Sequence, residues 1–243
     1  MNDFNKILSA VKSVTESQVV KIFVPSANEE FVFKPLTAKQ QKDLVKTAAE
    51  KNSGIISFYE TLNSIINTNS IKSYEFYLFD REYIVTMLRA LNLSNKLTVR
   101  DVEYDLLQLQ NNRITMSDTI KTKIIETDDI SLTCGIPTLK TDSTYNTFLN
   151  KATNKNISET FGDLFIFEVI KYIQRIKSAS ADVDIVLDEL NVQQRYQLVE
   201  SLPAKIYNNV IDYISDVKNK EKELFKINGK IVDVEMNQGF FTA

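Results

Sequence analysis

The sequence predicts an α+β protein that is mainly helical, with small antiparallel sheets and hairpins. Three observations support this fold class: apolar residues recur at helical spacing in most segments, they alternate strictly over 130–136, and an Asn-Gly pair joins two short β-type runs near the end. The chain has 243 residues, enough to bury a sizeable core. We therefore expect an N-terminal helix or docking arm over 1–18 and a single α+β domain over 19–243.

The first part of the chain combines helical and strand patterns. Within 1–18 the apolar residues are spaced near 3.6, which is typical of an amphipathic helix. Two strands are predicted at 19–24 and 31–33, because turn-forming residues separate them. Thr37 is a good N-cap for the next helix, and Gln40 three residues later completes a capping box.

Three more helices are predicted before 110. One runs from about Ile55 to Asn69, and Asp80 is interpreted as the N-cap of the next. Arg89 lies off the apolar stripe of that helix, so we interpret it as a surface or rim salt-bridge partner rather than a ligand site. Residues 98–110 are interpreted as another helix because Val102, Leu106 and Leu109 share one face.

The second half of the chain begins with strand-like alternation over 113–136, which indicates a sheet with one wet face. The polar, Asn/Thr-rich stretch 140–160 predicts a mobile or partner-ordered loop. A helix over 161–176 is apolar nearly all round, so it belongs in a core or an interface. Two further helices are predicted at 191–202 and 203–218.

The chain is predicted to end in a hairpin at about 224–236. Asn228 and Gly229 accept the positive φ that both central residues of a type I′ turn require. Phe240 and Phe241 follow near the end of the chain. The sequence leaves two alternatives for this pair: the rings pack in the core, or they are offered to a partner.

The composition argues against catalysis. The chain has no histidine and a single cysteine, which excludes Ser-His and Cys-His nucleophiles and Cys/His zinc sites. Cys134 lies in an alternating apolar run and is interpreted as an inert core residue. The five glycines are too scattered to form a phosphate-binding loop. We therefore expect no enzyme, no cofactor and no metal ion.

The balance of charge points away from nucleic acid. The 29 basic and 32 acidic residues give a formal charge of −3 without a concentrated basic patch. No apolar run approaches the length of a membrane span, so no membrane association is expected. One alternative stays open, a Mg²⁺-dependent hydrolase using Asp182, Asp184 and Asp188. The simpler interpretation is that these are exposed acids of a loop or a helix start.

The order of the elements resembles the hub proteins of the T4-like bacteriophage baseplate, which include the hub subunit and the hub assembly protein. The likeness covers about residues 19–243 and rests on order and spacing rather than on one motif. The sequence segments that carry it are Phe33-Lys34-Pro35-Leu36-Thr37, Gln41-Lys42-Asp43-Leu44, Asp80-Arg81-Glu82-Tyr83-Ile84, Leu88-Arg89, Gly135-Ile136-Pro137-Thr138, Leu190–Leu202 with Pro203, and Phe240-Phe241. This chain departs from some members in lacking cysteine pairs near Tyr104 and near the Asn228-Gly229 hairpin.

The resemblance implies a structural or chaperone-like assembly protein of contractile-tail morphogenesis that binds hub and wedge proteins. It would act in the virion baseplate or in the host cytoplasm during assembly, and its oligomeric state stays open. Candidate partner-binding residues are Phe4, Phe240 and Phe241, together with the loop 140–160. A host-directed binding protein is the alternative with the same composition.

Overall fold

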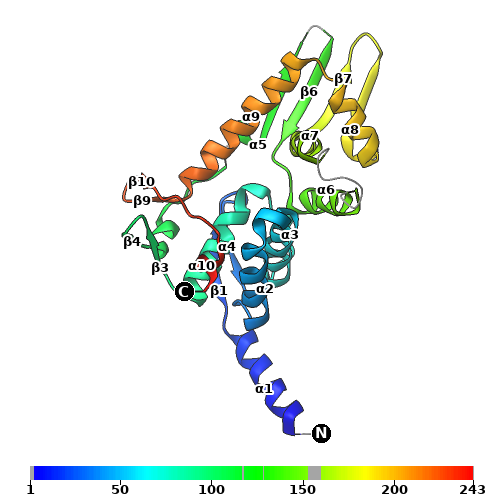
Figure 1. Ribbon diagram of the computed structural model, residues 1–243. Coiled ribbons are helices and arrows are strands. Elements are labelled where there is room, and N and C mark those ends of the chain that lie inside the picture. The colour runs from blue at the N-terminus through cyan, green and yellow to red at the C-terminus, as the bar shows by residue number, and fades with distance from the viewer. Residues whose placement is uncertain (1–2, 117, 128, 153–159, 243) are drawn as a thin grey trace. The chain divides into compact units, whose positions relative to one another are not determined.

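The structure, a computed structural model, describes residues 3–116, 118–127, 129–152 and 160–242 (Figure 1). It is 55% helical and 21% strand, with antiparallel sheets of two and four strands, which confirms the mainly helical α+β class. The helices are α1 (Asp3–Ser17), α2 (Ala38–Ala49), α3 (Lys51–Asn69), α4 (Leu78–Asn92), η1 (Leu106–Asn111), α5 (Asp118–Lys121), α6 (Leu139–Ala152), α7 (Thr160–Tyr172), η2 (Leu187–Glu189), α8 (Val192–Glu200), α9 (Ala204–Glu223) and α10 (Gln238–Phe241). The strands are β1 (Val20–Val24), β2 (Glu29–Phe33), β3 (Lys96–Val99), β4 (Val102–Asp105), β5 (Thr122–Glu126), β6 (Ile130–Gly135), β7 (Ile173–Ser178), β8 (Val183–Val186), β9 (Lys226–Ile227) and β10 (Lys230–Ile231).

The contacts within the chain divide it into two compact units. Unit 1 contains Met1–Tyr74, Asp80–Thr115 and Lys222–Ala243, and unit 2 contains Glu75–Phe79 and Met116–Glu221. A division of contacts does not tell whether the units unfold together. The single domain expected over residues 19–243 therefore stays a prediction.

Unit 1 begins, after α1, with the β1–β2 hairpin, which confirms the first two predicted strands. Val20 pairs with Phe33 and Val24 pairs with Glu29 in an antiparallel register. Asn28 occupies the turn with a φ of 53°, a conformation that asparagine tolerates well. The side chains that this hairpin buries in the unit 1 core are Ile22, Phe23, Val24, Phe31 and Phe33.

The capping box before α2 is confirmed in both directions. The N–H of Gln40 donates to Thr37 Oγ1 at 3.2 Å, and the N–H of Thr37 donates to Gln40 Oε1 at 2.9 Å. α3 is interrupted at Gly54, whose φ of −146° and ψ of 45° are not helical. Its regular part therefore begins near the predicted Ile55 and ends at Asn69, as expected.

The interpretation of Asp80 as an N-cap is wrong. α4 begins at Leu78, so Asp80 lies in its first turn, and its side chain is fully buried. The carboxylate accepts hydrogen bonds from the N–H of Ser26 at 2.9 Å and from Ser26 Oγ. Its donors therefore come from the turn after β1, which sequence spacing along the helix could not indicate.

The predicted helix over 98–110 is also wrong. β3 and β4 form a hairpin whose turn residues, Arg100 and Asp101, have φ of 49° and 65°. The chain then continues into η1, where Leu106 and Leu109 are buried as the pattern predicted. The apolar spacing was shared by a hairpin and a short 3₁₀ helix, and it did not distinguish them from one α-helix.

Unit 2 is built around a four-stranded antiparallel sheet in the order β5-β6-β7-β8. Ile125 lies opposite Leu132, and Leu132 lies opposite Ile176, so these three side chains share the buried face. The other face is wet, as the alternation predicted, but in β5 the buried residue is Ile125, and Ile124, which the alternation grouped with the apolar residues, is 61% exposed. α8 and α9 confirm the two predicted helices, with Pro203 directly before α9.

Two predictions in unit 2 need correction. Residues 140–152 of the expected loop 140–160 lie in α6 and residue 160 begins α7, while 153–159 lie outside the described residues. Helix α6 exists because apolar residues at helical spacing, Leu139, Tyr145 and Leu149, are buried despite the polar composition. The helix predicted over 161–176 ends at Tyr172, and its last residues belong to β7. An all-apolar run does not separate a buried helix from a buried strand.

The predicted hairpin at the end of unit 1 is confirmed. β9 and β10 are antiparallel, with Lys230 opposite Ile227. Asn228 and Gly229 between them have φ of 52° and 79°, as a type I′ turn requires. None of the helices in the described part of the chain has both the length and the apolar character needed to cross a bilayer.

Candidate functional site

The apolar face of α1 is the largest group of exposed apolar side chains on one helix. Phe4 is 66% exposed and Ile7 is 65% exposed. Leu8 and Val11 continue the same stripe and are also exposed, whereas the side chain of Val14 lies outside the described residues. The spacing i, i+3, i+4, i+7 places these side chains on one side of the helix. We call Phe4, Ile7, Leu8 and Val11 the α1 face.

Phe240 and Phe241 pack in the core, which is one of the two alternatives that the sequence left open. Their exposed fractions are 2% and 0%, so both rings are core residues in unit 1. Asn237 caps α10 by accepting from the N–H of Phe240 at 3.1 Å, and Gln41 of α2 donates to the carbonyl of Phe241 at 2.9 Å. The expectation that Phe240 and Phe241 contact a partner is therefore corrected, because their rings pack inside unit 1.

Arg89 is the second correction at this end of unit 1. Its side chain is 1% exposed rather than on a surface or rim. Its guanidinium donates to the carbonyls of Phe240 at 3.0 Å, of Lys96 at 2.9 Å, and of Ser94. The structure pairs it with no carboxylate among the described residues. Burial lowers the pKa of Arg89, but the carbonyl oxygens satisfy its donors.

Two of the three acids of the hydrolase alternative form ion pairs with arginines, and the third lies in a turn. Asp184 accepts from Arg175 Nε at 2.6 Å, and Asp188 lies 3.0 Å from Arg195 Nη1. Asp182 sits in a turn with a φ of 52°. Nearby cations weaken the field that would hold Mg²⁺. In the described part of the chain no group of three potential metal ligands comes together.

Two adjacent acids, Asp128 and Asp129, precede β6 in the sequence. Asp128 is outside the described residues. Asp129 accepts from the N–H of Ser180 at 2.7 Å and from Ser180 Oγ at 2.8 Å. These hydrogen bonds hold the pKa of Asp129 below its usual value. This carboxylate therefore organises the β7–β8 turn and needs no bound cation.

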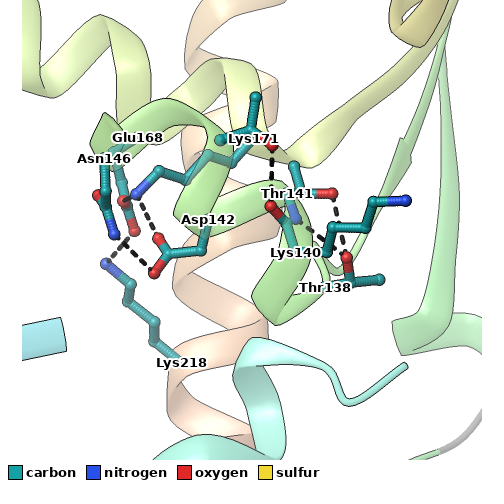
Figure 2. Close-up of polar contacts among 9 residues, drawn as sticks. Thr138, Lys140, Thr141, Asp142, Asn146, Glu168, Lys171 and Lys218 are labelled. Atoms are coloured by element: carbon teal, nitrogen blue, oxygen red, sulfur yellow. Dashed lines mark hydrogen bonds and ion pairs between the residues drawn. The ribbon is translucent and has the colours of Figure 1, made fainter. Parts of the chain in front are cut away.

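The most enclosed charged cluster in the described part of unit 2 joins α6, α7 and α9, and Figure 2 shows it. Lys171 Nζ lies 2.7 Å from Asp142 Oδ1 and 3.1 Å from Glu168 Oε2. Lys218 reaches the other oxygen of Glu168 at 3.4 Å, and Asn146 donates to Asp142 at 3.0 Å. The side chains of Asp142 and Lys171 are 2% and 9% exposed.

This cluster is neutral, with two carboxylates and two ammonium groups. Burial acts against both charged partners, but the carboxylates of Glu168 and Asp142 raise the pKa of Lys171 above its usual value. Burial likewise opposes the charge on Glu168, yet Lys171 and Lys218 hold its pKa below its usual value. Lys171 and Glu168 therefore stay charged, and their ion pairs hold the three helices together. A carboxylate with a lowered pKa is a weak proton acceptor, so the cluster does not supply a general base.

The single thiol is confirmed as a core residue. Cys134 is fully buried in β6, and its burial raises the pKa to about 12. A nucleophilic cysteine needs a low pKa and access to solvent. Cys134 therefore has no role in a site.

One surface was missed by the sequence analysis because 98–110 was interpreted as a helix. A groove of about 500 Å³ runs along β3 in unit 1. The residues that line it are Arg89, Lys96, Leu97, Thr98, Val99, Arg100, Asp233, Glu235, Asn237, Gly239 and Phe240. Only an edge-strand interpretation of 96–99 could have indicated such a groove.

Comparison of the chain with protein-family models, with curated proteins and with solved structures gives no match. The resemblance to phage baseplate hub proteins therefore rests on the order and spacing of sequence segments, and it enters the functional argument as a proposal.

Proposed function

We propose that the protein acts by binding other proteins, as a structural or assembly component, and that the α1 face is its docking surface. The observation that carries this proposal is the exposure of Phe4 and Ile7, each about two thirds open to solvent. Burying a side chain of this size contributes about 2 kcal/mol. A partner that covers the α1 face would gain this free energy without any change in the rest of the chain.

An apolar groove on another protein is the occupant that fits this face. α1 has 15 residues, which is about two heptads. A self-associating coiled coil usually sustains its heptads over about three to four repeats. A second copy of α1 would therefore bury too little to form a stable pair, whereas a groove surrounds the helix and covers the whole stripe.

The sequence resemblance supplies the class of partner. We propose that the groove belongs to a hub or wedge protein of a T4-like phage baseplate, and that the protein acts in the virion or in the host cytoplasm during assembly. Support comes from the segment order over residues 19–243 and from a composition poor in catalytic groups. The proposal includes no catalytic step, no cofactor and no nucleic acid.

The test is co-expression of the chain with hub and wedge proteins of a T4-like phage, followed by affinity purification. Phe4→Glu is expected to remove the complex, because it replaces the most exposed apolar side chain of the α1 face with a charge that the contact would bury. Ile71→Glu is the matched control, since Ile71 is 54% exposed elsewhere in unit 1. Circular dichroism checks that both variants keep the fold.

The outcomes separate the competing functions. Binding by Phe4→Glu equal to that of the unchanged chain would contradict the α1 proposal. Failure to bind any hub or wedge protein, with capture of a host protein that Phe4→Glu loses, would favour the host-directed alternative. The hydrolase alternative predicts heat on titration with Mg²⁺, and that heat should vanish in Asp184→Asn.

A further inference from the structure

The outer edge of β3 carries backbone groups that pair with no strand among the described residues. β3 pairs only with β4 in a two-stranded sheet, so its other edge faces away from that pair. The groove described above runs along this edge, with consecutive residues 96–100 on one side. Free main-chain groups beside a groove are the basis of strand addition, in which an extended peptide joins a sheet.

The phase of the hairpin shows which groups point outward. The N–H of Leu106 donates to the carbonyl of Asn95 at 2.7 Å, so Asn95 is bonded across to the β4 side. In an antiparallel pair such positions alternate, which makes Leu97 and Val99 inward-bonding and Thr98 outward-pointing. Lys96, also outward, already bonds Ser94 Oγ and Arg89. The N–H and carbonyl of Thr98 therefore stay open toward the groove.

The opposite wall has the same property. Residues 232–236 follow β10 without regular secondary structure; Val232 and Met236 are buried, while Asp233 and Glu235 are exposed and line the groove. The structure pairs the N–H groups of residues 233–236 with no acceptor among the described residues. Both walls thus include main-chain N–H groups without an acceptor among the described residues.

We infer that this groove binds an extended segment of another protein, which adds to the outer edge of β3 through main-chain hydrogen bonds to Thr98. The walls carry charges of both signs, with Arg100 on one wall and Asp233 and Glu235 on the other. None of these three side chains forms an ion pair with a described residue. The segment that fits therefore alternates apolar residues with polar residues of both signs.

A second copy of β3 is not the occupant. An antiparallel pair of β3 edges centred on Thr98 would place Lys96 of one copy opposite Arg100 of the other. Like charges directly opposite each other destabilise a strand pair. Charged residues on an edge strand block self-pairing in this way and leave the edge available to a different sequence.

This inference shares with the proposed function only the premise that the chain binds proteins, and it concerns a surface distinct from α1. The probe is a fluorescein-labelled heptapeptide in which valine alternates with glutamate, threonine and lysine. Binding is measured by fluorescence anisotropy with the full chain. A peptide of the same composition in block order serves as the peptide control, because it lacks the alternation that a strand requires.

Thr98→Pro removes the outward N–H and places a ring against the incoming strand. It is expected to weaken binding of the alternating peptide by about tenfold or more. Glu103→Ala gives the reference for loss of the exposed pair between Glu103 and Lys96, because Lys96 lines the groove. Glu103→Pro is the matched control for the N–H, since Glu103 lies opposite Thr98 and its N–H points from the other edge of the hairpin. This variant should bind within about twofold of Glu103→Ala. Phe4→Glu should also bind normally, which distinguishes this site from the α1 face.

Amide exchange in the unchanged chain gives a second readout that does not depend on a variant folding. Added alternating peptide should slow exchange of the Thr98 amide and leave the Glu103 amide unchanged. The inference is overturned if the alternating peptide gives no saturable signal up to about 1 mM. It is also overturned if the block peptide binds equally well, or if Thr98 shows no protection.

Discussion

Asp80, Arg89 and Lys171 are charged side chains that the fold buries. Each forms a hydrogen bond or an ion pair with at least one residue that is distant in the sequence. Asp80 takes its donors from Ser26, 54 residues earlier. Arg89 bonds the carbonyl of Phe240, 151 residues later. A buried charge is tolerated only when such partners are present. Sequence spacing indicated a cap position for Asp80 and a surface or rim position for Arg89, because it cannot reveal partners that only the fold supplies.

The dependence of unit 1 on Arg89 can be measured directly. Arg89→Ala should lower the free energy of unfolding by about 3 kcal/mol, because the buried carbonyl of Phe240 and the part-buried carbonyls of Ser94 and Lys96 lose a donor. Urea denaturation followed by circular dichroism measures this change. Arg113→Ala is the control: Arg113 forms an exposed pair with Glu30 at 3.4 Å, and its loss should cost under about 1 kcal/mol. Equal effects of the two substitutions would contradict the structural role given to Arg89.

Glu168 predicts a pH dependence of stability. Its folded pKa lies below the ordinary value of 4.5, because Lys171 and Lys218 outweigh the effect of burial. A lowered folded pKa stabilises the protein above the unfolded pKa, and this contribution is lost as the pH falls through the folded value. The stability difference between the unchanged chain and Glu168→Gln should therefore be constant from about pH 5 to 8 and shrink below about pH 4.5. Urea titrations at several pH values test this; a difference that grows on acidification would contradict the assignment.

At the scale of elements, the sequence predicted correctly those features whose interactions lie within a few neighbouring residues. The capping box at Thr37 and the Asn228-Gly229 turn were predicted correctly because their hydrogen bonds and φ angles involve neighbouring residues only. The helix expected over 98–110 was wrong, and so was the part of the expected loop 140–160 that the structure describes. Their local patterns fit two structures, and tertiary burial selected between them.

The same distinction applies to the candidate surfaces. The α1 face was predicted from helical spacing, since a helix of this kind needs no tertiary information. The β3 groove was not predicted, and the sequence left burial of Phe240 as one of two alternatives. Both depend on the segment 232–241 packing within unit 1, which no local pattern encodes.

The cap of α2 gives a prediction at this scale. Thr37→Ala should destabilise the protein by about 1 kcal/mol, because the N–H of Gln40 loses its acceptor. Thr47→Ala is the matched control in the same helix: Thr47 Oγ1 donates to the carbonyl of Asp43 at 2.9 Å, which adds little to a helix interior. Its effect should stay within about 0.5 kcal/mol. A chemical denaturation series on both variants and the unchanged chain measures the difference. A larger loss of free energy of unfolding in Thr47→Ala than in Thr37→Ala would contradict the cap assignment.

At the scale of the whole molecule, chain order ties the two units together. Unit 1 consists of three stretches of chain, and Met116–Glu221 of unit 2 lies between the second and the third. If unit 2 unfolded alone, unit 1 would have to hold the ends of a loop of about a hundred residues. The entropy of closing such a loop opposes independent unfolding of unit 2, which favours the single cooperative domain expected over residues 19–243.

The absence of tryptophan from the sequence makes this expectation testable with single-tryptophan reporters. Tyr59→Trp reports on unit 1 and Tyr196→Trp reports on unit 2. Both positions are partly buried, so the new indoles should change fluorescence on unfolding. For one cooperative domain, the two reporters and circular dichroism should give the same urea midpoint after correction for each substitution's own effect on stability. If the two fluorescence midpoints differ while circular dichroism of each variant shows two steps, the units unfold separately, and the loop-closure coupling is too weak to join them.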